Sequence, residues 1–182
     1  DMQLTRLANE GRLRDRLPEQ LKRMLSDIRS QALAKNFAGQ WLQLRNLDLV
    51  RPNDEKFPAY DDDLRRAMRI ESELLFSRIQ NEDRSILEFV TADYTHVNER
   101  LARHYGIKGI TGRKFVEVSL RDTNRRGILS HASVLTITSH PDRTSAVKRG
   151  QWVLNNILGT PPPPAPDDVP ALEDQGRKLT GS

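Results

Sequence analysis

The residues best suited to bind a ligand gather in one short segment near the end of the chain. Arg143, Lys148 and Arg149 supply positive charge there, and Thr144 or Ser145 stands where a helix N-cap is expected, after a His-Pro stop. Backbone amides at a helix N-terminus attract anions, and nearby cations add to that attraction. The segment therefore fits two interpretations: a binding site for an acidic ligand, or a capped helix with a solvated basic face.

A second group of candidate residues lies on two predicted helices upstream. Helical spacing over residues 62–80 gives an apolar face, and Glu71 falls near its middle. An unpaired carboxylate there would be costly, so we expect a structural ion pair between Glu71 and an arginine, or a contact with a helix end. Glu99 and His104 lie on the next long predicted helix and are, with Glu71, the candidate buried polar residues. His104 lies near the apolar stripe of this helix, as a hydrogen-bonded core residue. If an acidic ligand binds, these groups should converge with the basic segment in one cleft.

Several kinds of site are excluded or unsupported. The chain has no Cys, which excludes disulfides, thiolate zinc sites, cysteine nucleophiles and covalent attachment of a c-type haem within it. The histidines show no metal-ligand spacing, and the pair His96 and Glu99 is too weak to predict a metal site. Neither a Gly-x-Ser-x-Gly elbow nor a Walker phosphate loop is present. The sequence predicts no metal and reveals no self-contained catalytic activity.

The composition is that of one domain with a thin core. The chain has 182 residues, of which 36% are hydrophobic and 30% charged, and its formal net charge is +4. Such a chain can bury a real core and still carry a wet surface or a tail. The basic bias is mild and no dense Lys/Arg run appears, so we expect no nucleic-acid partner. No apolar run approaches the length of a membrane span.

The apolar periodicity predicts an all-α fold. We expect a single helical, bundle-like domain over residues 1–160, with a possible minor β-hairpin that uses a strand near 115–120. A proline-rich, disordered tail should follow over 161–182, as a semi-rigid spacer to further chain. The predicted helices lie near 4–8 and 18–28, from Ser30 to Leu44, and over 62–80, 84–90, 94–105, 127–138 and 145–158. Ser30 is the expected N-cap of the third helix, on which Leu33 and Phe37 should share the inner face with Leu44. Asp61, Asp62 and Asp63 should open the helix over 62–80, while Asp93 should cap the helix over 94–105 and Gly106 should end it.

The last predicted helix carries a candidate partner contact. Val147, Leu154 and Leu158 form its expected inner face. Trp152 points away from that face, so we expect it to contact a neighbouring domain.

Four stretches of the sequence resemble a known group of domains. They resemble the helical domains of unknown function, of PSD and PSCyt type, that occur in large planctomycete-type c-type cytochrome proteins. The similarity extends over nearly the whole chain and two adjacent family segments, with a boundary near 106–125. The stretches are Asn36-Phe37-Ala38-Gly39-Gln40-Trp41-Leu42, Ala92-Asp93-Tyr94-Thr95 with Asn98-Glu99-Arg100-Leu101-Ala102, His104-Tyr105-Gly106-Ile107 and, most specifically, Arg143-Thr144-Ser145-Ala146-Val147-Lys148-Arg149-Gly150-Gln151-Trp152-Val153-Leu154.

The resemblance implies a multidomain bacterial protein that is exported to the periplasm or cell envelope. In that group a haem-binding Cys-x-x-Cys-His segment commonly follows the proline-rich spacer, so haem c is expected downstream and no cofactor in this chain. The resemblance transfers no catalytic residues. The pattern usually has Pro at the position of Ala146 and an aromatic residue at that of His96.

Two functions stay open at this point. The first is a structural or docking module that packs against neighbouring domains of the same polypeptide, such as a haem domain. It predicts an exposed apolar patch near the last helix and no deep polar pocket. The second is a binding or enzymatic domain for an anionic ligand, such as one derived from a polysaccharide, at the Arg143–Arg149 segment. It predicts a cleft where basic residues meet Glu71, Glu99 or His104.

Overall fold

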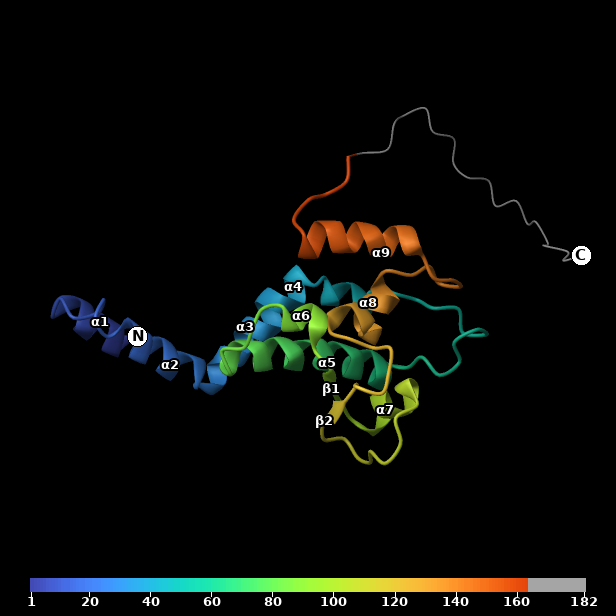
Figure 1. Cartoon of the computed structure of the whole chain (residues 1–182), viewed down its shortest axis with the longest axis horizontal. Helices are drawn as coiled ribbons and strands as arrows, with labels where there is room; N and C mark the ends of the chain where they lie inside the picture. Colours follow the sequence, from blue (N-terminus) through green and yellow to red (C-terminus); the bar gives the residue numbers. More distant parts are fainter. Residues whose placement is uncertain (164–182) are drawn as a thin grey trace, which may run out of the picture.

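The computed structural model describes residues 1–163, and these residues are mostly helical with one small sheet (Figure 1). The long helix α5 (Asp62–Asn81) runs through the centre of the body. It begins where the Asp61 carboxylate accepts a hydrogen bond from the Leu64 backbone N–H at 2.6 Å, a side-chain N-cap. The predicted helix over 62–80 is confirmed, as is the mostly helical class. The predicted tail lies outside the described residues from 164 onward.

The first two helices form an arm. Helices α1 (Met2–Asn9) and α2 (Leu17–Leu25) extend away from the body in Figure 1. Leu7 and Gln20 are buried in the arm, and Arg23 pairs with Asp1 at 2.6 Å. The arm is therefore a helical hairpin with internal contacts of its own.

The helix after the arm contains a π-helical turn that changes its buried face. The 3₁₀ turn η1 (Ile28–Ser30), α3 (Gln31–Leu33), the π turn η2 (Ala34–Ala38) and α4 (Gly39–Trp41) follow one another, and the 3₁₀ segment η3 (Leu44–Asp48) comes next. The expected inner residues Leu33 and Phe37 are largely exposed, whereas Ala34 and Ala38 are buried. A π turn adds one residue to the helical repeat, which rotates the later side chains. The expected Ser30 cap is also wrong, since Asp27 caps this segment.

The segment 94–97 is a strand and not the start of a helix. Strand β1 (Tyr94–Val97) pairs antiparallel with β2 (Val116–Ser119), with Tyr94 opposite Ser119. Helix α7 (Glu99–Tyr105) starts only after Asn98, whose side chain accepts a hydrogen bond from the Leu101 N–H at 3.0 Å. The expected Asp93 cap is therefore wrong. The strand expected near 115–120 is confirmed, but α7 lies between the two strands, so they form no simple hairpin.

The C-terminal helices complete the body. The 3₁₀ turn η4 (Ile128–Ser130) and α8 (Ala132–Ile137) fill the segment predicted as helix over 127–138, and α6 (Glu88–Thr91) is the short helix expected near 84–90. Helix α9 (Ala146–Trp152) continues as the π turn η5 (Val153–Ile157). The Trp41 indole N–H donates to the Asn156 carbonyl at 2.6 Å, and the Asn156 amide donates back to the Trp41 carbonyl. These bonds fix the last helix to α4.

The prediction that Val147 lies on the inner face of α9 and that Trp152 points away from this face is wrong. Trp152 is only 4% exposed and belongs to the core cluster with Leu75, Phe76 and Phe89, whereas Val147 is 81% exposed. The helix is rotated relative to the face that its aliphatic residues suggest, because the large indole contributes more buried surface than Val147 does. Trp152 is therefore covered by this domain and is not free to contact another one.

Two apolar clusters share α5. One surrounds Leu75, Phe76 and Ile79 in its second half, and the other surrounds Leu64 and Met68 in its first half. The buried polar residues Glu71 and Ser72 lie between these positions on the same helix. A polar layer thus separates the two apolar parts of the core.

Candidate functional site

The basic segment lies beside a cleft of about 460 Å³. The cleft lies between the loop 50–60, the first half of α5, α8 and the turn 139–144. Of the predicted candidates within the described residues, it is lined by Arg143, Thr144, Arg149 and His104, while Ser145, Lys148, Glu71 and Glu99 are not part of its lining. Its apolar wall contains Val50, Phe57, Leu64, Met68 and Leu135.

Backbone hydrogen bonds join two walls of the cleft, the loop 50–60 and the turn 139–144. His140 N donates to the Arg143 carbonyl at 2.8 Å and closes the turn, and Ser139 forms an antiparallel bridge with Thr144. The loop 50–60 is fixed to this turn because Asn53 N donates to the Pro141 carbonyl at 2.8 Å. The sequence gives no sign of this contact, which joins positions nearly ninety apart.

Ser145 and Lys148 belong to the start of α9 and not to the cleft. The Ser145 hydroxyl accepts a hydrogen bond from the Lys148 backbone N–H at 3.2 Å, which makes Ser145 the N-cap. Lys148 is exposed to solvent. Of the two interpretations that the sequence allowed, the capped helix with a solvated basic face therefore describes Ser145 and Lys148.

Three polar groups lie at the cleft with unused hydrogen-bonding capacity. The Tyr60 hydroxyl is buried without a hydrogen-bond partner among residues 1–163, and burial raises the pKa of this phenol. Burial, assisted by Arg125 and Arg100, lowers the pKa of His104, so its imidazole is neutral at pH 7. The Arg149 Nε makes a long hydrogen bond of 3.5 Å to the Thr138 hydroxyl. These groups can accept a ligand without breaking strong existing bonds.

Glu71 is buried, but its partners differ from those expected. Its side chain is 1% exposed, and it accepts hydrogen bonds from the hydroxyls of Thr95 and Tyr105, each at 2.6 Å. No arginine or helix end pairs with it within the described residues, so the expected ion pair is wrong. Desolvation raises the pKa of Glu71 to about 7, although the two hydroxyls and the more distant Arg125 act in the opposite direction.

The network around Glu71 extends to a histidine that sequence reasoning did not single out. His131 Nε2 lies 3.9 Å from Glu71 Oε1, and its Nδ1 lies 3.1 Å from the Ser72 hydroxyl, which contacts Ser133 at 2.7 Å. The order Ser-His-Glu is that of a hydrolase triad. However, all of these side chains are buried, and burial lowers the pKa of His131 to about 3, so the imidazole is neutral. No substrate can reach this serine, and the network is structural.

The other two expected buried groups are near the surface. Glu99 is 42% exposed at its side chain, pairs with Arg103 at 2.8 Å and accepts a hydrogen bond from the Gly112 N–H. His104 is exposed as a whole residue, although its ring packs against Tyr105 and is desolvated enough for its pKa to be lowered. The expectation that they are buried polar residues is wrong. The hydrophobic stripe of α7 is carried by Leu101 and Ala102, which leaves both groups at its margin.

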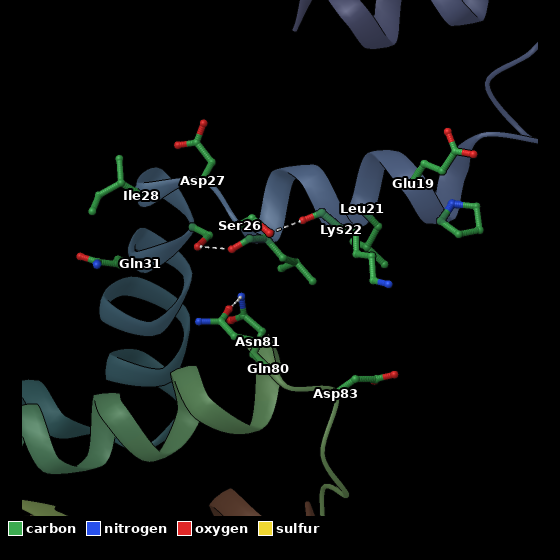
Figure 2. Close-up of a pocket in the computed structure, with 13 residues that line it drawn as sticks. Glu19, Leu21, Lys22, Ser26, Asp27, Ile28, Gln31, Gln80, Asn81 and Asp83 are labelled. Atoms are coloured by element: carbon green, nitrogen blue, oxygen red, sulfur yellow. Dashed lines mark hydrogen bonds between the residues drawn. The ribbon is translucent and has the colours of Figure 1, made fainter. Parts of the chain in front are cut away.

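A wider groove of about 730 Å³ separates the arm from the end of α5. Figure 2 shows its two sides: Leu21 and Lys22 come from α2 and Ser26 follows it directly, while Gln80 and Asn81 come from the last turn of α5. The side chains shown across this opening do not form hydrogen bonds with one another in Figure 2; the dashed lines stay within each side. The groove therefore leaves one face of α2 without cover from the body.

The described part of the chain contains neither a cluster of metal-ligating side chains nor a membrane-spanning helix. Within residues 1–163, no three His, Cys, Asp or Glu side chains gather closely enough to hold a metal ion. In the same range, no helix combines the length and the apolar character required to cross a membrane.

The fold and these sites define a mostly helical module with an arm, a cleft and a buried polar network. A family model described as PSD4, protein of unknown function (DUF1592), matches residues 1–107, and the chain belongs to this family. A second model, described as PSCyt3, protein of unknown function (DUF1588), matches residues 125–181. No curated protein and no solved structure matched. The resemblance to PSD- and PSCyt-type domains, named for planctomycete cytochrome-type proteins, is confirmed.

Proposed function

We propose that this chain is a non-haem docking module of a larger, exported c-type cytochrome-like protein, and that its arm packs against a neighbouring domain that carries haem c. The matching family names, both of cytochrome-associated type, support the multidomain parent. The arm lies inside the PSD4 match, so it is a regular part of that domain. This proposal assigns no catalytic step to the chain.

The exposed stripe on α2 is the observation that carries the proposal. Leu17, Leu21 and Met24 follow helical spacing on α2 and are exposed, with Leu21 at 56%. Ile28, in the following turn η1, is exposed as well. Burying a side chain of this kind stabilises a complex by about 1.5–3 kcal/mol before the costs of association. A helical hairpin that holds such a stripe away from its own body is suited to pack against another domain.

The arm's role can be tested by hydrogen exchange in the larger parent protein that this proposal predicts. We expect the amides of 17–28 to be protected there and to lose protection in a Leu21→Asp variant. A Leu158→Asp variant is the matched control, since Leu158 is 60% exposed but lies on the other end of the chain. Arm amides that exchange as fast in the intact wild type as in Leu21→Asp would rule out docking by the arm.

The haem context needs its own measurement. A reduced-minus-oxidised visible spectrum of the same intact protein should show sharp c-type haem bands, because the attachment motif is expected beyond this chain. A featureless spectrum would remove the cytochrome part of the proposal. It would leave the hydrogen-exchange result to decide whether the arm docks on some other domain.

A further inference from the structure

We infer that the cleft beside Arg149 is a binding site for a small carboxylic acid with an apolar body. The inference is independent of the docking proposal, because the arm lies at the other end of α5. The volume of about 460 Å³ falls in the range of small-molecule sites. An apolar enclosure with a few convergent polar groups is the usual form of such sites.

The walls of the cleft select an apolar ligand body. Leu64 and Met68 are almost fully buried and form a rigid floor on α5, while Phe57 comes from the loop that Pro141 holds in place. Carbohydrate sites need many hydrogen-bonding groups to replace water at each hydroxyl. This wall offers few, so an anion derived from a polysaccharide fits it poorly.

The charge at the cleft selects a single anionic head group. Arg149 has only one long hydrogen bond to give up, and a guanidinium fork matches a carboxylate. Lys56, which also lines the cleft, already has Asp142 as an ion-pair partner at 3.8 Å. One carboxylate is enough to match the fork of the Arg149 guanidinium.

The unpaired Tyr60 hydroxyl is the second observation that points to a ligand. A buried hydroxyl without a partner costs about 1–3 kcal/mol, so most such groups in folded proteins are paired. Tyr60 lines the same cleft, and its buried hydroxyl would have to turn toward a carboxylate held by Arg149, which would provide an acceptor for its O–H. The bound acid would then satisfy a polar group that the protein itself leaves unsatisfied.

Calorimetric titration of the 182-residue chain with octanoate, octanol and acetate tests this inference. Octanoate should bind at least about tenfold more tightly than either control, because only it has both the apolar body and the charge. Arg149→Gln should weaken octanoate binding about tenfold and leave octanol binding unchanged. Lys148→Gln removes one positive charge from the adjacent residue, which lies outside the cleft. It should change neither the affinity for octanoate nor that for octanol.

Each alternative result has a defined meaning. Octanoate binding no stronger than octanol binding overturns the assignment of an acid, since the cleft would then be only an apolar cavity. If Arg149→Gln and Lys148→Gln lost octanoate affinity equally, the acid would be attracted diffusely to the basic helix. That result would also overturn the assignment of a specific acid site. Thermal unfolding of both variants checks that they fold, and the comparison of ligands on the wild type does not depend on any variant.

Discussion

At the scale of single residues, the most perturbed groups are structural ones. Glu71 and His131 lie against each other in a fully buried layer, and the hydroxyls of Thr95 and Tyr105 satisfy the carboxylate. The contact between Glu71 and His131 is no ion pair, because burial keeps the imidazole neutral. The Tyr105 hydroxyl also accepts a hydrogen bond from the Ala132 N–H at 2.8 Å and so links α5, α7 and α8. Perturbed pKa values here report burial and not catalysis.

The stability of the protein should depend on the protonation of Glu71. Its folded-state pKa of about 7 lies above the ordinary 4.5, so its contribution to stability is fully present below pH 4.5 and is lost as the pH rises through 7. Glu71→Gln removes this dependence. Urea unfolding should be measured at several pH values. Between pH 4.5 and 8, the free energy of unfolding of the variant should rise relative to that of the wild type by up to about 3 kcal/mol.

In the wild type and in Glu71→Gln alike, His131 changes the free energy of unfolding with pH in the opposite direction to Glu71. Its pKa is lowered to about 3, so the stability it provides is lost as the pH falls from 6.5 towards 3. Glu99→Gln is the control, because an exposed ion pair such as that with Arg103 contributes less than about 1 kcal/mol. A constant difference between Glu71→Gln and the wild type across this pH range would contradict a raised pKa for Glu71.

At the scale of elements, a close approach of two segments fixes the middle of the chain. Gly127 has φ +46°, and its N–H donates to the Ala92 carbonyl at 3.0 Å. A Cβ at this position would collide with the backbone of Phe89 and Val90 in α6. Only glycine allows η4 to lie directly against α6 at this point.

Two glycine substitutions should therefore have opposite effects. Gly127→Ala is expected to lower the free energy of unfolding by about 3 kcal/mol or more, since backbone atoms must move. Gly150→Ala lies within α9 with nothing within 4 Å of the new Cβ, and should raise it by about 0.5–1 kcal/mol through helix propensity. Chemical denaturation of both variants measures the difference. A Gly127→Ala protein as stable as the wild type would mean that η4 and α6 do not touch in solution.

At the scale of the whole molecule, the chain divides into a body and an arm. The body has the two apolar clusters around α5, whereas in the arm only Leu7 and Gln20 are buried. The ion pair between Arg23 and Asp1 joins the two helices of the arm. Segments with few buried contacts open at a lower free energy than the core does. The arm should therefore be the least stable part of residues 1–163 when no other domain covers it.

Hydrogen exchange of the 182-residue chain alone tests this division. We expect amides of α2 to exchange through local opening at least about 2 kcal/mol more easily than those in the centre of α5. Mild denaturant should lower the protection of α5 and leave that of α2 nearly unchanged. Equal protection and equal denaturant dependence of the two helices would show that arm and body unfold as one unit.

The sequence by itself determined the features that depend on neighbouring residues. The apolar repeat and Asp61 placed α5, Gly106 ended α7 in a left-handed conformation, and contiguous motifs identified the family. These signals are local, because capping and helical periodicity act within one or two turns.

Tertiary structure alone decided the buried faces, the polar network and the cleft. The π turns η2 and η5 rotate their helices, pairing with β2 makes 94–97 a strand, and Trp152 displaces Val147 from the core. The partners of Glu71 and the walls of the cleft come from segments far apart in sequence. Which of several amphipathic faces is buried depends on the shape of the surface it meets, and no single segment contains that information.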